Sequence, residues 1–274
     1  MISQLIRDKQ DLTYLSWSRI RHSSGTAGSF LKAYSEIDGT KMYYKLSDYD
    51  SVRGVTGHES VNELIVDRLL GILGVEHLSY RLIHADVLVE GKVLETYVCA
   101  SENFRQRGED KQALDACYEC ERLPEEGPLQ FCLRMGWEEY IWQMLAVDFL
   151  ILNRDRHGAN IEVLRDRKKK KIRLAPLFDQ GVSLLSRCET EEAIESFDVT
   201  ADLPVQCFVG SRSAKENLKL IPPDRMPRFS PLKESDKARL LDGLDGILTP
   251  RLQEKIWDMI WKRWCFYEDF CNTR

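Results

Sequence analysis

The sequence has no apolar run of about 18 residues, the length that a membrane-spanning helix needs, so no membrane span is expected. Its first residues also lack a basic segment followed by an apolar stretch, the pattern of a secretory signal. We therefore expect a cytoplasmic protein, with secretion as an effector by another route left open. An excess of positive charge is missing as well, because 39 Lys and Arg stand against 44 Asp and Glu, a net charge of −5. Direct binding to DNA is therefore not expected.

A zinc-finger pattern is also missing, although the chain has eight cysteines. Cys117 and Cys120 have the spacing of half a zinc site, but no second pair of Cys or His follows at a matching distance. Structural zinc usually takes four ligands. Without a secretory signal, the cysteines are expected to be reduced and free.

The most informative stretch is 153–160, which reads Asn-Arg-Asp-Arg-His-Gly-Ala-Asn. Asp155 and Asn160 stand five residues apart, and Asp179 follows a short apolar segment in Leu-Phe-Asp-Gln-Gly. Kinases use a carboxylate to orient the attacking hydroxyl, an Asn on one Mg²⁺, and an Asp between Mg²⁺ and the phosphates. The spacing Asp-x4-Asn is that of the kinase catalytic loop. A polar hairpin with ordinary turn residues is the alternative, and one short motif does not decide between them.

Two blocks, 148–160 and 174–184, together resemble the C-terminal kinase domain of HipA-type proteins, and most of all the compact CtkA-like serine/threonine kinases. The segment Asp-Arg-His-x-x-Asn also resembles phosphoinositide 3/4-kinases. The resemblance implies that Asp155 is the catalytic base and that Asn160 and Asp179 hold Mg²⁺. His157 is expected to brace this loop in the ATP site rather than to act as the base.

The first hundred residues are typical of a small β-sheet with one helix. Asp38-Gly39 is a strong hairpin signal, and Glu90-Gly91 marks a second turn. Apolar residues at helical spacing, with a C-terminal glycine, predict one helix. The expected strands are 14–20, 29–34, 41–46, 80–89 and 92–100, five in all, and the expected helix is 58–74.

The loop His22–Gly28 follows the first expected strand. Its small residues and two glycines suit a nest of backbone N–H groups around phosphate oxygens, and a plain hairpin loop is the alternative. The residues expected to contact ATP here are Ser24, Gly25, Thr26, Ala27 and Gly28. The resemblance further implies self-phosphorylation at Ser23 or Ser24, against the alternative that both are ordinary turn residues.

Lys45, in the third expected strand, is the candidate for holding the α- and β-phosphates. Its alternative is an edge-strand lysine that faces water. Glu63, on the following helix, is the expected partner of Lys45, with Glu59 as the competitor. Adenine is expected where the chain leaves the sheet, at about 99–103, and the residues expected to contact it are Val98, Cys99, Ala100 and Ser101.

Residues 104–134 are expected to form a surface helix and loop. A firm helix is predicted over 137–152, with Asp148 positioned to brace the catalytic loop, and a hairpin follows with the basic tip 165–171. We interpret that tip as solvated rather than as a binding site. The acidic segment 187–202 is expected as a loop. Helices are predicted at 237–248 and 251–270, the second with a tryptophan stripe in the core.

We therefore predict an α+β, two-lobed protein-kinase-like fold. Its N-terminal lobe, 1–103, is a small β-sheet with one key helix, and its C-terminal lobe, 104–274, is mainly helical. The predicted function is an ATP- and Mg²⁺-dependent serine/threonine-protein kinase that transfers the γ-phosphoryl group to a protein hydroxyl. The alternatives are a phosphoinositide kinase, a small-molecule kinase and a pseudokinase used as a binding module. Longer HipA-type toxins carry an extra N-terminal subdomain that we do not find here, so a stand-alone kinase is expected rather than one with an antitoxin partner.

Overall fold

A six-stranded sheet makes up much of the first half of the computed structural model, which describes residues 4–20 and 27–273. The strand order is β1-β7-β8-β4-β3-β2, and β1 runs parallel to β7. The strands are β1 (Leu5–Asp11), β2 (Ser18–Ile20), β3 (Ala27–Ile37), β4 (Thr40–Lys45), β7 (Tyr80–Val89) and β8 (Lys92–Glu102). The short strands β5 (Tyr49–Asp50) and β6 (Gly54–Val55) form a separate pair.

The prediction of five strands was wrong by one, because β1 was not expected. Its sequence, Leu-Ile-Arg-Asp-Lys-Gln-Asp, is polar and mostly exposed, so it shows no alternation between apolar and polar residues. The expected strand 14–20 begins only at Ser18, since Tyr14 is 63% exposed and precedes the pairing with β3. The other four expected strands are present, with β3 and β8 longer than predicted.

The hairpin of β3 and β4 sets which side chains share a face. Asp38 and Gly39 both have positive φ, 51° and 75°, as a two-residue turn of the mirror-image type requires. This turn places Lys32 directly opposite Lys45, and Lys45 lies opposite Cys99 on β8. Leu31, Ala33, Met42, Tyr44, Val98 and Ala100 pack into a core on one face of the sheet. Lys32, Lys45 and Cys99 therefore lie on the other face.

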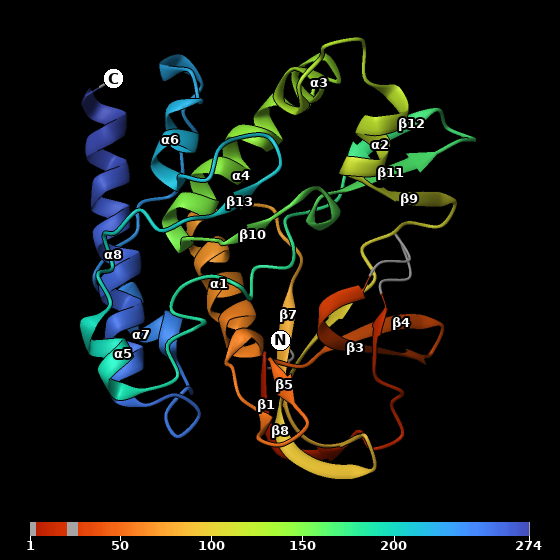
Figure 1. The fold of residues 1–274 in the computed structure, drawn as a ribbon, viewed down its shortest axis with the longest axis vertical. Coiled ribbons are helices and arrows are strands. Elements are labelled where there is room, and N and C mark those ends of the chain that lie inside the picture. Colours follow the sequence, from red (N-terminus) through yellow and green to blue (C-terminus); the bar gives the residue numbers. More distant parts are fainter. Residues whose placement is uncertain (1–3, 21–26, 274) are drawn as a thin grey trace.

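Helix α1 (Glu59–Leu73) lies between the sheet and the helices of the second half (Figure 1). It ends at Gly74, which has φ 75° and donates its N–H to Leu70 O, as predicted for the C-terminal cap. Its apolar residues belong to the same buried core as those of the later helices. Polar residues of α1 are also buried, among them Asn62, Glu63 and Asp67. Buried polar groups need partners, so this helix marks where the site is to be sought.

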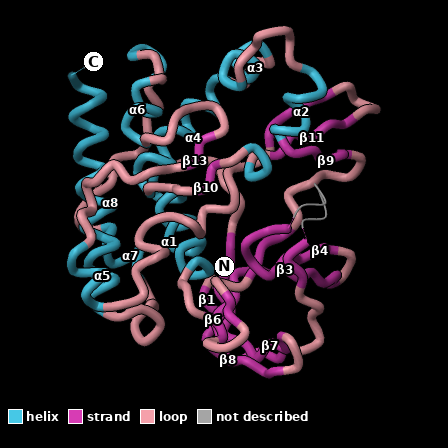
Figure 2. The backbone as a smooth tube through the Cα atoms, in the orientation of Figure 1, coloured by secondary structure: helices cyan, strands magenta, loops and turns pink. Residues whose placement is uncertain are grey.

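The second half is mainly helical but includes a small sheet (Figure 2). Its order is β12-β11-β9, so the predicted hairpin of β11 and β12 gains a third strand. The β elements are β9 (Glu109–Ala113), β10 (Asp155–Arg156), β11 (Glu162–Asp166), β12 (Lys171–Leu174) and β13 (Gln206–Cys207). Strand β9 reads Glu-Asp-Lys-Gln-Ala and has no β-branched or aromatic residue, so only its pairing with β11 explains it.

The long helix α8 forms one side of the molecule (Figure 1). The helices of this half are α2 (Leu114–Glu121), α3 (Pro128–Arg134), α4 (Glu138–Ile151), α5 (Glu191–Ser196), α6 (Ala214–Lys219), α7 (Asp236–Leu241) and α8 (Pro250–Thr273), with 3₁₀ turns η1 (Gly158–Asn160) and η2 (Pro223–Arg225). The predictions for α4 and α8 are confirmed. The helix expected over 237–248 stops at Leu241, and Gly243 and Gly246 beyond it have positive φ. None of the helices within the described ranges is long and apolar enough to span a membrane.

Candidate active site

A cavity of about 410 Å³ lies against the face of the sheet that carries Lys32, Lys45 and Cys99. The residues that border it come from both halves of the chain. From the second half, Asn160 and Asp179 line the same cavity. Three predicted site residues far apart in the sequence, Lys45, Asn160 and Asp179, therefore meet at one cavity.

Lys45 is buried, with 7% of its surface exposed, and forms two ion pairs. Its Nζ lies 3.0 Å from Glu63 Oε1 and also contacts Asp179 Oδ1. Burial alone would lower the pKa of the Lys45 ammonium, but the carboxylates of Asp179 and Glu63 outweigh it, so the pKa is raised and the lysine stays charged. Glu59 accepts a hydrogen bond from Asp48 N–H instead, so the expected pairing of Lys45 with Glu63 is present.

Asp179 also pairs with a second ammonium group, that of Lys32, which the sequence motifs did not predict. Lys32 Nζ lies 3.2 Å from Asp179 Oδ2. The position of Lys32 could have been predicted from the sequence, because the two-residue turn at Asp38-Gly39 fixes Lys32 opposite Lys45. The backbone N–H of Asp179 donates to Tyr80 Oη at 3.1 Å, and Asp179 has φ 57°. A positive φ outside glycine is uncommon and is found often at functional sites.

Asp155 and Asn160 are in contact, as their spacing in a catalytic loop predicts. Asn160 Nδ2 donates to Asp155 O at 2.7 Å and to Asp155 Oδ2 at 3.3 Å. His157 Nε2 lies 3.6 Å from Asp155 Oδ2, and both side chains are half-buried. The amide of Asn160 thus uses its nitrogen within the loop, which leaves Oδ1 as an acceptor.

The oxygen atoms at this end of the cavity suit Mg²⁺, a hard cation that prefers carboxylate and carbonyl ligands. Asn160 and Asp179 border the same cavity, and Asp155 is hydrogen-bonded to Asn160. Both oxygens of Asp179 already face positive charge, from Lys45 and Lys32. The donor types, a carboxylate and an amide oxygen, are those that a divalent cation takes, and its binding to Asp179 would replace one of these ion pairs.

Arg156 hydrogen-bonds to the loop that carries Asp155 and Asn160 and is only 1% exposed. It forms an ion pair with Asp148 of α4, with Nη2 2.9 Å from Oδ1. Its Nη1 donates to Asn160 O at 3.2 Å and to Phe178 O at 3.0 Å. Burial would lower the pKa of Arg156, but Asp148 raises it further, so the guanidinium stays charged. The predicted bracing role of Asp148 is confirmed.

The expected adenine contacts divide into two groups. Cys99 and Ser101 border the cavity, whereas Val98 and Ala100 pack into the core on the opposite face. Strand β8 is paired with β4 and with β7 through this stretch, so its backbone is occupied within the sheet. The side chains of Val98 and Ala100 therefore do not face the cavity, because adjacent residues of a strand point to opposite faces. The first backbone outside the sheet follows Glu102, where Asn103, Phe104 and Arg105 border the cavity.

The expected phosphate loop falls mostly outside the described residues. Ser23, Ser24, Gly25 and Thr26 are not described. Ala27 and Gly28 are the first residues of β3, and Ala27 pairs with Ile20 of β2. The predictions for this loop therefore stay predictions, as does the lobe boundary between residues 103 and 104.

No protein-family model matches the chain, and no curated protein sequence does. Among solved structures, the proinflammatory kinase CtkA of Helicobacter pylori matches over 97% of this chain and 97% of its own, with a TM-score of 0.65 and 16% sequence identity. HipA, from the Shewanella oneidensis toxin–antitoxin complex of HipA, HipB and operator DNA, matches over 93% of this chain and 59% of its own, with a TM-score of 0.43 and 16% identity. At these identities the likeness concerns the fold. The chain therefore has the two-lobed α+β fold of a CtkA-like kinase, as the motifs predicted.

Proposed function

We propose that the chain is an ATP- and Mg²⁺-dependent serine/threonine-protein kinase. The observation that carries the proposal is the meeting of Lys45, Asn160 and Asp179 at one cavity, with Asp155 one hydrogen bond from Asn160. Phosphoryl transfer depends on positioning and on charge, and these side chains supply both. The fold shared with CtkA supports the same reading.

The phosphate end of the site is formed by Lys45 and Lys32. Glu63 holds Lys45 at the cavity, and both ammonium groups contact Asp179. A polyphosphate would supply further oxygens to these two cations. Asn160 Oδ1 and Asp179 would hold Mg²⁺, which neutralises charge on the β- and γ-phosphates when bound.

The acceptor end is formed by Asp155. Its carboxylate would orient a serine or threonine hydroxyl and accept its proton while that oxygen bonds to the γ-phosphorus and the bond to the ADP oxygen breaks. Asn160 and His157 lie beside this carboxylate, at 3.3 Å and 3.6 Å from Oδ2. They would fix its direction, and we include self-phosphorylation at Ser23 or Ser24 in the same proposal.

The test is an incubation with labelled ATP and Mg²⁺ in three arms: a mixture of folded proteins, vesicles containing phosphatidylinositol, and a panel of small hydroxylated and amino-containing metabolites. The wild type should label serine or threonine in protein. Asp155→Ala should reduce labelling by about 10²–10⁴-fold, the usual worth of a positioned proton acceptor. Asp198→Ala is the matched control, because Asp198 is exposed and its carboxylate accepts from the N–H and the hydroxyl of the nearby Thr200.

Each other outcome selects a different function. Label in the vesicle arm alone would mean a lipid kinase, and label in the metabolite arm alone would mean a small-molecule kinase. Nucleotide binding without transfer in any arm, measured by calorimetry, would mean a pseudokinase. Intact-mass measurement over time would show whether the protein phosphorylates itself.

A further inference from the structure

Gln180 follows Asp179 directly and is buried between the Asp155 loop and α1. Its side chain is 2% exposed, and its Oε1 accepts from Arg156 Nη2 at 2.7 Å and from Asn153 Nδ2 at 3.4 Å. Its backbone N–H donates to Glu63 Oε2 at 2.9 Å. One residue thus bonds to the catalytic loop through its side chain and to α1 through its backbone.

The two donors to Gln180 stand on either side of Asp155 in the chain. Asn153 Oδ1 accepts the backbone N–H of Asp155 at 3.0 Å, and Arg156 Nη1 donates to Asn160 O. Asn153 and Arg156 are each 1% exposed, so water does not replace these bonds. Asn153 and Arg156, which both hold the Asp155 loop, therefore share Gln180 Oε1 as an acceptor.

On its other side, Gln180 connects to the phosphate end. Glu63 uses Oε2 for Gln180 N–H and Oε1 for Lys45 Nζ at 3.0 Å. Glu63 is fully buried. A continuous buried path therefore joins the residue proposed to hold the acceptor hydroxyl to the residue proposed to hold the phosphates.

The charges explain why an amide suits this position. Around Gln180 stand the carboxylates of Glu63, Asp148 and Asp179 and the cations Lys45 and Arg156. A carboxylate at 180 would add an unpaired negative charge to a cluster whose three carboxylates are already paired with Lys45, Lys32 and Arg156. An apolar side chain would leave one N–H of Arg156 Nη2 without an acceptor, while the other still donates to Asp148 Oδ1. Glutamine supplies an acceptor without adding charge.

We propose that Gln180 is a positioning residue, which sets the distance between the Asp155 loop and the Lys45–Glu63 pair. This inference rests on the proposed kinase function. In-line transfer requires both ends of the site in register, and a displacement of about 1 Å can cost about 100-fold in rate. Loss of the Gln180 side chain should therefore slow transfer while nucleotide binding is retained.

The test compares Gln180→Met with Gln253→Met. Methionine is similar in length and unbranched but gives no strong acceptor. Gln253 lies on α8, away from the active site. It is also buried, at 8% exposure, and donates through Nε2 to Leu248 O. The measurements are the single-turnover rate at saturating Mg·ATP, the Kd for Mg·ATP, the thermal midpoint, and amide hydrogen exchange over 153–160.

Gln180→Met should lower the saturated rate by roughly 10–100-fold, with Kd little changed and faster exchange over 153–160. Gln253→Met should lower the thermal midpoint by no more than Gln180→Met does, and it should keep the wild-type transfer rate. If Gln180→Met does not fold, the same measurements are made on Gln180→Asn, whose amide is one methylene shorter and so cannot reach Arg156 in the same way. A wild-type rate in the Gln180 variant, or a rate loss that saturating nucleotide abolishes, overturns the inference while the kinase function stands. A wild type that transfers no phosphate overturns the proposed function and this inference with it.

Discussion

At the scale of single residues, Asp179 bridges two like charges. Lys32 and Lys45 stand directly opposite each other on neighbouring strands, an arrangement that is unfavourable for two cations. Asp179 contacts both, through Oδ2 and Oδ1. The same carboxylate is also a proposed ligand of Mg²⁺, so its removal should affect both stability and metal dependence.

We expect Asp179→Ala to lower the free energy of unfolding by about 1–3 kcal/mol, the usual cost of leaving buried polar groups unpaired. Part of the loss should be restored by salt, which screens the repulsion between Lys32 and Lys45. Calorimetric titration with Mg·ATP should show that Mg²⁺ no longer strengthens nucleotide binding. Unchanged dependence on Mg²⁺ would contradict the assignment of Asp179 as a metal ligand.

Some residues of the candidate site could be predicted from the sequence, and others could not. Asp155, Asn160 and Asp179 fit a known spacing, and Lys45 and Glu63 followed from the order of strand and helix. Tyr80 and Gln180 could not be found this way, because Asp179 N–H reaches Tyr80 across 99 positions and Glu63 reaches Gln180 across 117. No local pattern predicts such pairs, since both partners are buried polar groups whose neighbours are decided by packing.

At the scale of elements, α1 holds the segment after Asp179 at very short range. Asn62 Nδ2 donates to Gly181 O at 3.0 Å and to Ser183 O at 3.1 Å. A Cβ at Gly181 would lie 2.9 Å from Glu59 O and 3.1 Å from Glu63 Oε1. Any side chain at 181 would therefore push the first turns of α1, and Glu63 with them, away from the site.

Gly181→Ala should accordingly destabilise the protein by about 1–3 kcal/mol, as overpacking does, and weaken nucleotide binding through Glu63. Gly71→Ala is the control on the same helix, because a Cβ there meets nothing within 4 Å. That control should stabilise the protein by about 0.5–1 kcal/mol, since alanine favours helix over glycine. Equal behaviour of the two variants in denaturant titration and in nucleotide binding would contradict the close contact.

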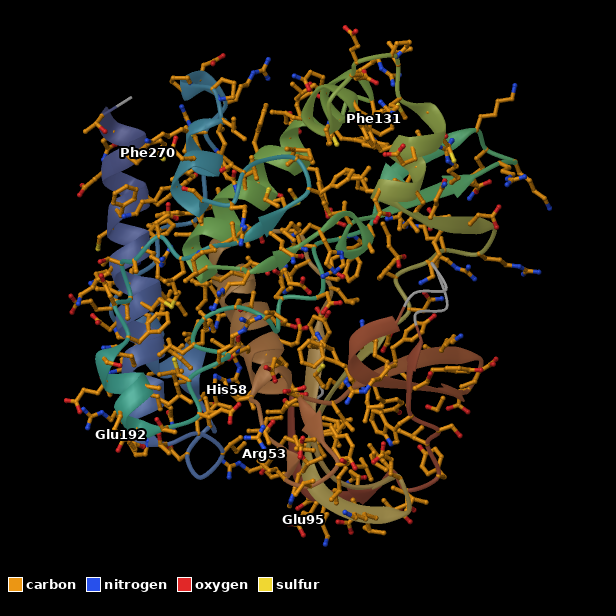
Figure 3. All side chains as sticks on the ribbon, in the orientation of Figure 1. Arg53, His58, Glu95, Phe131, Glu192 and Phe270 are labelled. Carbon is orange, nitrogen blue, oxygen red and sulfur yellow. The ribbon has the colours of Figure 1, made fainter. Side chains whose placement is uncertain are left out.

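The start of α1 also predicts a dependence on pH. His58, labelled near the lower end of α1 in Figure 3, is the N-cap residue, and burial lowers the pKa of its imidazole from 6.5 to about 4. Between these values the unfolded chain binds a proton that the folded protein does not, so stability should fall as pH drops from 6.5 toward 4. His77 acts in the opposite sense: burial alone would lower its pKa, but hydrogen bonds to Asp67 and Val75 O raise it, so its contribution is present below 6.5 and is lost as pH rises.

His58→Asn should remove this sensitivity, because asparagine suits an N-cap and does not titrate. Between pH 7 and pH 5, the wild type should lose about 2 kcal/mol more than the variant. Urea titrations of both proteins at several pH values measure the difference. Parallel slopes for the two proteins would show that His58 is not the group responsible.

The elements that the sequence predicted well are those with a strong internal pattern, namely α1, α4, α8 and the two glycine-turn hairpins. Strands β1 and β9 were missed because their residues are mostly charged or amide side chains, and partners from distant parts of the chain make them strands. The end of α7 was misjudged because leucines continue at helical spacing to 248, while the glycines at 243 and 246 take positive φ. The spacing of the leucines therefore predicted a longer helix, but the glycine conformations end α7 at Leu241.

At the scale of the whole molecule, the core of the second half extends into the first lobe through α1, while the sheet has a second core on its other face. The buried residues of α1 belong to the same cluster as those of α4 and α8, although α1 is connected to the sheet on both sides in sequence. Within the second half, Arg263 of α8 is 2% exposed and donates to Phe149 O, Val199 O and Ala201 O. Separation of the lobes would expose much of this cluster.

We therefore expect one cooperative unfolding transition rather than two. Hydrogen exchange of strands β7 and β8 and of helices α4 and α8 should report the same free energy of global opening. Mg·ATP at about 100 times its Kd should raise that energy by about 2.7 kcal/mol for both groups of elements alike. A sheet that opens at lower energy than the helices, or that alone gains protection from nucleotide, would contradict a core that extends into the first lobe through α1.

The register of β3 against β4 limits how the chain can change in length. Strand β4 is fixed by its pairing with β8, and Lys32 faces the cavity because the turn between the strands has two residues. Insertion of one residue at Asp38-Gly39 would slide β3 by one position and turn Leu31 out of the core toward the face that carries Lys45, with Lys32 turned into the core. Insertion of two residues would keep each side chain on its present face. Natural variants of this hairpin should therefore differ in length by even numbers, and an odd difference should be accompanied by a bulge in β3.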